Sequence, residues 1–477
     1  MLLVTRVVII GGGPGGYEAA LVGSQLGGDV TLIDRDGMGG SAVLTDCVPS
    51  KTLIATAEVM MTVKGSEELG LRIDVDDATD DANGVSVDLA KVNRRVLALA
   101  ERQSADIYDK LIAEGVTVVP GRARLQGTDT VIADTDEGEQ RFPADVILVA
   151  TGAHPRELPT ARPDGERILT WTQVYDLTEM PEHLIVIGSG VTGAEFANAY
   201  DALGVDVTLV SSRTTVLPGE DADAAQVLQD VFTRRGMTVL SESRAESVTR
   251  EGDQVTVHLT DGRTVTGSHC LMAVGSIPNT ADMGLEEAGI TLNDGGYIQV
   301  DKVSRAGVRG VYAAGDCTGV HALASVAAMQ GRIAMWHALG DAVAPLDLNV
   351  VSSNVFTSPE IATVGTTQKQ VDSGEVRALA INLPLSGNPR AKMQGIHDGF
   401  VKLFCLPTTG IIIGGVVVAP RASELIHTIS LAVSEKITVD NFAHDFTVYP
   451  SLSGSIAEAA RRLHGHSTDK LERQIDI

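Results

Sequence analysis

The chain has few cysteines, and their spacing is that of neither a metal site nor a disulfide scaffold. Its 477 residues include only Cys47, Cys270, Cys317 and Cys405. These lie far apart and form no C-x-x-C pair, the spacing typical of structural zinc sites and redox-active thiols. We therefore expect neither a metal centre nor a network of disulfides.

Basic residues are also scarce, and no apolar run near the N-terminus is long enough for a membrane span. The chain has 37 lysines and arginines against 62 acidic residues, a formal net charge of -25. Such a charge repels nucleic acid and anionic membrane surfaces, so neither is expected as a partner. The N-terminal apolar run is short and leads directly into glycines. We expect it to be the first strand of a cytoplasmic protein with no integral membrane segment.

Aromatic residues make up only 4% of the chain, whereas glycine is abundant. The 50 glycines and 44% hydrophobic residues are typical of α/β proteins, in which small residues let backbones approach one another and their cofactors. A chain of this length is too long to fold around a single hydrophobic core. It is expected to form two to four domains.

One strand-helix-strand unit occurs twice. The first copy is predicted over residues 4–10, 17–25 and 29–34. The second is predicted as a strand over 184–188, a helix to about residue 203 and a strand over 206–210. The chain therefore contains an internal duplication of a βαβ unit.

Elements outside these two units follow simpler patterns. The sequence predicts an acidic surface loop over 74–83, a long helix over 88–114, short strands between 116 and 149, and a helix over 323–339. Beyond residue 348, predicted strands over 401–404 and 411–418 and two helices indicate a further α+β domain.

The turn of the first unit carries Gly11, Gly13 and Gly16, and Asp34 closes its second strand. In a dinucleotide-binding fingerprint, such glycines permit a tight turn, an approaching pyrophosphate and close helix packing. The acid accepts hydrogen bonds from a ribose. This unit is therefore predicted to bind a dinucleotide.

The second unit repeats the glycines as Gly188, Gly190 and Gly193 but lacks the acid. Its second strand ends in Ser211, Ser212 and Arg213. Without a carboxylate the 2'-phosphate of NADPH is not repelled, and the arginine and serines are candidates to bind it. The other interpretation is that Arg213 is an ordinary surface arginine. The sequence therefore does not decide whether the nucleotide is NADH or NADPH. Two such sites indicate electron transfer between two dinucleotides.

With these features the chain resembles the flavoprotein disulfide reductase family, to which dihydrolipoamide dehydrogenase belongs. The resemblance covers nearly the whole chain. Its marks are Gly11 to Gly16, Gly39-Gly40 to Lys51, Ala150-Thr151-Gly152, Gly188 to Glu195, Gly275 to Asn279, Tyr312 to Asp316 and Pro359 to Ala362.

The resemblance implies two Rossmann-like dinucleotide-binding domains and a C-terminal α+β domain that forms a homodimer interface. The implied division is residues 1–153 and 271–347 for FAD, 154–270 for NAD(P), and 348–477 for the dimer interface. Besides the first fingerprint, the implied FAD contacts are Pro14, Arg35, Gly40, Ser41, Cys47, Lys51, Ala123, Thr151, Gly152, Asp316 and Ala324. Besides the second, the implied NAD(P) contacts are Glu195, Ser211, Ser212, Arg213 and Gly275.

The departures from the family fall on its disulfide chemistry. Ala42 stands where the family has its interchange cysteine, so only Cys47 of the pair is left. Tyr449 and Gly454 stand where the family has the histidine and glutamate that serve the active site of the other subunit. An alanine supplies no attacking thiolate, and tyrosine is a poor general base at neutral pH. His444 is the nearby candidate for a displaced acid-base role.

The resemblance implies that Lys51 pairs with Glu195 near the reactive edge of the flavin, where a cation favours hydride acceptance. A surface ion pair without catalytic role is the alternative. Cys47 is expected either to lie against the flavin as a charge-transfer cysteine or to be an inert buried thiol.

The expected function is therefore an FAD-dependent NAD(P)H dehydrogenase that passes electrons to a quinone, without disulfide reductase activity. A quinone accepts two electrons directly from a reduced flavin, and Tyr449 is a candidate to stack on its ring or donate a hydrogen bond. Two alternatives are a soluble pyridine nucleotide transhydrogenase and a catalytically idle flavoprotein subunit. Soluble transhydrogenases in this family keep the first cysteine position and lose the second, the reverse of this chain.

Overall fold

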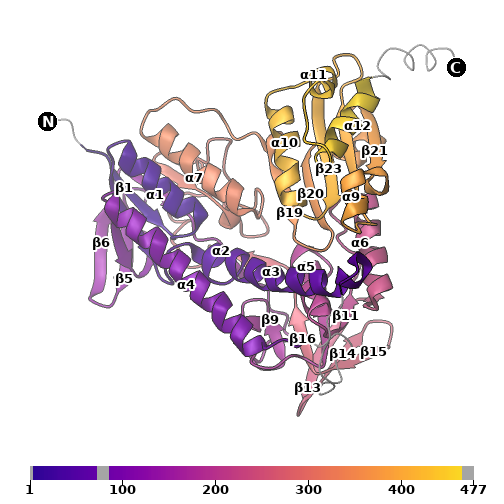
Figure 1. Ribbon diagram of the computed structural model, residues 1–477. Coiled ribbons are helices and arrows are strands. Elements are labelled where there is room, and N and C mark those ends of the chain that lie inside the picture. Colours follow the sequence, from indigo (N-terminus) through magenta and orange to yellow (C-terminus); the bar gives the residue numbers. More distant parts are fainter. Residues whose placement is uncertain (1–3, 72–84, 465–477) are drawn as a thin grey trace.

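The computed structural model describes residues 4–71 and 85–464 (Figure 1). The predicted acidic loop over 74–83 lies outside these residues. Three five-stranded sheets form the body of the molecule. Among the described residues, no helix combines the length and apolar character needed to cross a membrane.

The first sheet is parallel, with strand order β18-β7-β1-β2-β3. Its strands are β1 (Arg6–Ile10), β2 (Asp29–Asp34), β3 (Thr117–Pro120), β7 (Val146–Val149) and β18 (Val311–Ala313). Their apolar side chains are almost entirely buried, as expected for a parallel sheet covered on both faces. The last strand comes from far along the chain, so residues near 311 complete a sheet that the N-terminus begins.

Two helices cross closely on one side of this sheet. They are α1 (Pro14–Gln25) and α7 (Ala324–Ala338), which lie side by side in Figure 1. A β-carbon on Gly331 would lie 2.0 Å from the carbonyl oxygen of Gly15, so glycine is required at this crossing. Both helices match the predicted segments 17–25 and 323–339 to within a few residues.

Other elements surround the first sheet. The helices are α2 (Gly40–Leu44), α3 (Cys47–Lys64) and the long α4 (Leu89–Ala113). An antiparallel sheet contains β4 (Arg122–Leu125), β5 (Thr130–Thr135) and β6 (Gly138–Pro143). The predicted long helix over 88–114 and the short strands between 116 and 149 are confirmed.

The second parallel sheet repeats the first and confirms the duplication. Its order is β12-β11-β10-β16-β9, with β9 (Ile168–Thr170), β10 (His183–Ile187), β11 (Asp206–Val210), β12 (Thr238–Leu240) and β16 (His269–Met272). Its helices are α5 (Val191–Ala202) and α6 (Ala222–Arg235). Antiparallel strands accompany it: β13 (Ala245–Glu251), β14 (Gln254–Leu259) and β15 (Thr264–Gly267), and the pair β8 (Ala153–Pro155) and β17 (Ser276–Pro278).

The third sheet is antiparallel and lies in the last part of the chain, as the sequence predicts. Its order is β19-β20-β23-β22-β21, with β19 (Ser352–Val355), β20 (Glu360–Gly365), β21 (Leu379–Pro384), β22 (Phe400–Cys405) and β23 (Ile412–Ala419). The accompanying helices are α8 (Gln368–Asp372), α9 (Pro389–Met393), α10 (Ala422–Ser434), α11 (Val439–Ala443) and α12 (Gly454–His464). The fold is therefore α/β, with two dinucleotide-binding units and a C-terminal α+β unit.

Short 3-10 helices complete the described structure. They are η1 (Gly65–Leu69), η2 (Val174–Asp176), η3 (Asp316–Thr318), η4 (Leu348–Val350) and η5 (Leu385–Gly387).

Candidate functional site

The first glycine turn has the shape of a phosphate cradle. Gly11 has φ +105°, and a β-carbon there would lie 2.3 Å from the carbonyl oxygen of Ala150. A β-carbon on Gly16 would lie 1.8 Å from the carbonyl oxygen of Gly11. Gly13, in contrast, faces open space, with no atom within 4 Å of that position. Its backbone is therefore accessible to a pyrophosphate at the N-terminus of α1, where the helix dipole favours an anion.

The acid of the first unit is held by the same turn. Asp34 accepts hydrogen bonds from the backbone N–H of Gly12 at 2.6 Å and of Gly37 at 2.7 Å. Its carboxylate is thereby fixed at the carboxyl end of β2, beside the glycines. This is the position at which a dinucleotide ribose is recognised.

The other residues expected to contact FAD lie at several places around this turn. Gly40 packs against it, since a β-carbon there would lie 2.8 Å from Cα of Gly13. Thr151 follows β7, and its hydroxyl donates to the carbonyl of Asn279 at 2.7 Å. The remaining positions are Pro14 and Ala324 as first residues of α1 and α7, Ser41 in α2, Gly152 beside Thr151, Ala123 buried in β4, and Arg35 exposed and paired with Asp36.

Asp316 supports the presence of a bound group at this site. It follows β18 at the same edge of the sheet as Thr151, and its carboxylate accepts no hydrogen bond from another residue in the described part of the chain. Burial and the nearby Asp46 carboxylate raise the pKa of Asp316 to about 6. A half-buried carboxylate without a donor is unfavourable, so a ligand that donates hydrogen bonds, such as the ribityl hydroxyls of FAD, fits it.

The second glycine turn repeats the first with one difference. A β-carbon on Gly188 would lie 2.1 Å from the carbonyl of Ala273, while Gly190 faces open space. Ser211 takes the place of the acid, but it is fully buried and its hydroxyl bonds to that of Ser189 at 2.7 Å. The exposed residues at this strand end are Ser212 and Arg213. Gly193 lies in α5, and Gly275 has φ +92° with open space around it.

The predicted contact between Lys51 and Glu195 is present and lies between two helices, α3 and α5. The Lys51 Nζ atom is 2.8 Å from Oε2 of Glu195, whose side chain is only 4% exposed. The other carboxylate oxygen accepts the backbone N–H of Phe356 at 2.8 Å. Glu195, in α5, therefore connects this helix to α3 and to the residue that follows β19. Each of its carboxylate oxygens accepts one hydrogen bond.

Charge is retained on the lysine. Burial has the largest single effect and lowers the pKa of Lys51, but Glu195, Cys47 and Asp46 together raise it by more, and the net shift is upward. Burial raises the pKa of Glu195, while Lys51 and the Phe356 N–H oppose the rise. Lys51 also lies over the Phe356 ring, 5.0 Å from its centroid. The arrangement presents a fixed cation beside the first residues of α3.

Cys47 begins α3 and has no cysteine partner. All four cysteines are free, and Ala42 lies in the adjacent helix α2. Burial, followed by the Asp46 charge, raises the pKa of the Cys47 thiol to about 11. Of the two interpretations of Cys47, this environment favours the inert thiol over a thiolate.

The thiol state of Cys47 is open to a direct test. With a pKa of about 11, only ~10⁻⁴ of the thiol is ionised at pH 7, so alkylation by iodoacetamide should be slow and should accelerate toward pH 10. Mass spectrometry of the digested protein would locate the label. Rapid, complete labelling of Cys47 at pH 7 would instead show a stabilised thiolate.

The C-terminal segment is at the surface of the single chain. Tyr449 is 82% exposed, and Phe446 and Val448 beside it are also highly exposed. His444 bonds through Nδ1 to the Asp440 carbonyl at 2.6 Å, and Gly454 begins α12. An exposed group of large apolar side chains is typical of a surface that another protein chain covers.

One charged cluster was not anticipated from the sequence. Lys402, in the middle of β22, is 3% exposed and contacts Asp221 at 2.8 Å and Asp223 at 2.7 Å. It joins the third sheet to the start of α6 in the second unit. A lysine within the otherwise apolar run of 400–405 was the available signal.

The comparisons with known proteins agree with this geometry. Residues 5–331 match the model of the pyridine nucleotide-disulphide oxidoreductases, and residues 351–460 match the dimerisation domain of the same family. A relative from Mycobacterium tuberculosis, NAD(P)H dehydrogenase (quinone), is 55% identical over 97% of this chain and 95% of its own length. Dihydrolipoyl dehydrogenase of Geobacillus stearothermophilus is 31% identical over 96% of this chain and 95% of its own length.

A solved structure extends the agreement to three dimensions. The crystal structure of LpdA from Mycobacterium tuberculosis superposes with a TM-score of 0.91 at 54% identity, covering 96% of this chain and 100% of that one. Together with the two glycine turns and the C-terminal sheet, these matches show that the chain belongs to the pyridine nucleotide-disulphide oxidoreductases, flavoprotein oxidoreductases that use FAD and NAD(P)H.

Proposed function

We propose that this enzyme oxidises NAD(P)H and reduces a quinone, without reducing disulfides. The carrying observation is that the Lys51–Glu195 contact is intact while all four cysteines are free. The residues for accepting hydride are thus retained, and a dithiol relay is missing. The name of the mycobacterial relative supports a quinone as acceptor. NAD(P)H, a proton and the quinone yield NAD(P)⁺ and the hydroquinone.

The proposed cofactor contacts follow the two glycine turns. FAD would be held by the turn at Gly13, by Asp34 and by Asp316, and when bound it supplies a carrier for two electrons. The nicotinamide nucleotide would lie on the turn at Gly190, with Ser212 and Arg213 near its adenosine ribose. Those two exposed side chains are compatible with NADPH as well as NADH.

The proposed organisation keeps the division drawn from the sequence. FAD would bind residues 1–153 and 271–347, NAD(P) residues 154–270, and residues 348–477 would form the interface of a homodimer. In such a dimer, Tyr449 would face the acceptor site of the partner chain. We place the enzyme in the cytoplasm.

Lys51 has a defined role in this proposal. Its ammonium group, held by Glu195, would place a positive charge beside the bound FAD, where it would favour acceptance of a hydride. Because Glu195 is itself held by the Phe356 N–H, the cation has one position rather than several. Fixed charge of this kind requires no reorganisation during the reaction.

A two-step anaerobic experiment tests the proposal against its alternatives. NAD(P)H added to FAD-loaded protein should bleach the flavin absorbance, and menadione should then restore it. Unchanged absorbance after NAD(P)H would indicate an idle subunit. Hydride transfer from NADH to thio-NADP that outpaces menadione reduction would favour a transhydrogenase.

A further inference from the structure

Quinone reduction needs a proton donor, and the residues that move protons in the disulfide chemistry of the family are replaced here. A quinone takes up two electrons and two protons to become a hydroquinone. The hydride of NAD(P)H supplies both electrons and one proton, so the second proton comes from solution. At the positions of the acid-base pair, Gly454 has no side chain and Tyr449 is 82% exposed in the single chain. A protein group that delivers the second proton has to be a different one.

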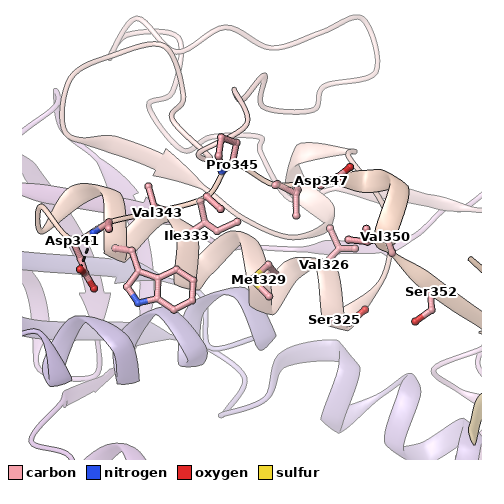
Figure 2. Close-up of a pocket in the computed structure, with 15 residues that line it drawn as sticks. Ser325, Val326, Met329, Ile333, Asp341, Val343, Pro345, Asp347, Val350 and Ser352 are labelled. Atoms are coloured by element: carbon pink, nitrogen blue, oxygen red, sulfur yellow. Dashed lines mark hydrogen bonds between the residues drawn. The ribbon is translucent and has the colours of Figure 1, made fainter. Parts of the chain in front are cut away.

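The pocket along α7 in Figure 2 is not the place to find this group. Val326, Met329 and Ile333 line it from the helix. The segment on its other side leads into residues 351–460, which match the dimerisation domain. We therefore expect a second copy of the chain to cover this pocket.

Asp46 lies in the turn between α2 and α3, where the family carries its disulfide. It directly precedes Cys47 in the chain. Its backbone N–H donates to the carbonyl of Ser41, the neighbour of Ala42, at 2.7 Å. The turn therefore holds Asp46 close to both positions of the family's cysteine pair. An acceptor that takes the place of the disulfide would meet this turn.

The Asp46 side chain makes none of the hydrogen bonds that usually hold an aspartate at the start of a helix. It occupies the N-cap position of α3, but its carboxylate accepts no hydrogen bond from the helix. No other group within residues 4–71 and 85–464 donates to this carboxylate. Asp46 is also half-buried. A carboxylate that loses water without gaining a donor favours its protonated form.

Titratable groups face Asp46 from several elements. Burial raises the pKa of Asp46, and the Lys51 cation opposes the rise. Behind the larger effect of burial, the charge of Asp46 contributes to raising the pKa of groups in α3, α5, η2 and η3, namely Cys47, Glu195, Tyr175 and Asp316. Asp46 therefore lies within electrostatic range of the Lys51–Glu195 contact and belongs to the same site.

We propose that Asp46 is the catalytic acid of quinone reduction, which gives a proton to a quinone oxygen as the electrons arrive. This inference rests on the proposed function and assigns the proton which that function requires. The O–H bond of the carboxyl group breaks, and an O–H bond of the hydroquinone forms. The half-buried carboxylate then regains a proton from water, so NAD(P)H, one proton and the quinone still yield NAD(P)⁺ and the hydroquinone.

Stopped-flow mixing with two acceptors tests this role. FAD-loaded protein is reduced with NAD(P)H and then mixed anaerobically with menadione or with ferricyanide, which takes up electrons but no proton. Asp46→Asn should slow the return of flavin absorbance with menadione by about 100-fold, an effect typical of losing a general acid. It should leave the return with ferricyanide, and the first reduction by NAD(P)H, within about threefold. Asp106→Asn, at an exposed aspartate of α4, should change none of these rates.

The pH dependence has a defined sign. Because the protonated carboxyl group is the donor, the rate with menadione should fall as the pH rises. Asp46→Glu should keep this dependence, whereas Asp46→Asn should lose it. A readout without turnover is the alkylation of Cys47 at fixed pH. Asp46→Asn should accelerate it by at least about twofold, since the Asp46 charge contributes to the raised pKa of the thiol.

The outcomes separate Asp46 from the proposed function. An unchanged menadione rate in Asp46→Asn, or equal slowing with menadione and ferricyanide, would overturn the assignment of Asp46. Parent protein that ferricyanide reoxidises and menadione does not would overturn the proposed function instead. If Asp46→Asn fails to retain FAD, the parent decides. A menadione rate that is lower in D₂O and falls with pH supports a proton donor, and a rate independent of both contradicts it.

Discussion

Replacing Lys51 with methionine is expected to lower kcat/KM for NAD(P)H oxidation by about 100-fold, the usual effect of removing one preorganised charge from an active site. The substitution preserves the apolar stem but removes the cation that Glu195 holds at 2.8 Å. The measurement is steady-state oxidation of NAD(P)H by FAD-loaded protein with menadione as acceptor.

Two further variants make this result specific. Lys64→Met removes another lysine of α3, whose Nζ bonds to the Ala202 carbonyl at the end of α5. It should leave kcat/KM within about twofold, because Lys64 lies at the far end of the helix from Lys51. Lys51→Arg should recover part of the activity, since it restores the charge with different geometry. Near-parental activity of Lys51→Met would mean that the Lys51–Glu195 contact is structural only.

Replacing Lys402 with methionine is expected to produce the largest loss of stability. Asp221, 4% exposed, would be left as a buried charge without its cation. Breaking a buried pair in this way costs about 3–5 kcal/mol. We expect the apparent Tm of the parent to fall by at least about 6 °C, measured by differential scanning calorimetry.

A double variant distinguishes the electrostatic cause of this stability loss from a loss of side-chain packing. Adding Asp221→Asn to Lys402→Met removes the stranded charge and keeps a good N-cap for α6, so the double variant should be more stable than Lys402→Met alone. Lys392→Met, at an exposed lysine of α9, should leave the Tm unchanged. A Tm drop in Lys402→Met that Asp221→Asn fails to relieve would contradict the electrostatic account.

Local patterns predicted much of the fold. The first two strands follow from β-branched runs that end at glycine and at Asp34, and the duplication follows from the repeated glycine spacing. The helix over 323–339 was likewise predictable, and it matches α7. These elements depend on neighbours in sequence, and their side chains alone specify strand or helix.

The resemblance also led to the contact between Lys51 and Glu195, although 144 residues separate them. No local pattern would have paired them. The sequence did not predict that the Phe356 N–H donates to the second carboxylate oxygen of Glu195, because a backbone donor has no sequence signature. The same applies to Lys402, whose partners Asp221 and Asp223 precede it by about 180 residues.

Ser211 shows a different limit of sequence reasoning. Its position at the end of β11 suggested a side chain facing the cofactor, like Asp34. In the structure the hydroxyl instead faces Ser189 and accepts the Arg213 backbone N–H at 3.1 Å. A short hydroxyl side chain can form hydrogen bonds with groups of its own loop. The residue type alone does not distinguish this role from ligand binding.

We propose that this enzyme combines the body of a disulfide reductase with a different electron acceptor. Steady-state NAD(P)H oxidation by the purified, FAD-loaded chain, compared across menadione, lipoamide and glutathione disulfide, tests it most directly. We expect turnover with menadione and none above background with either disulfide. Robust turnover with lipoamide would contradict it.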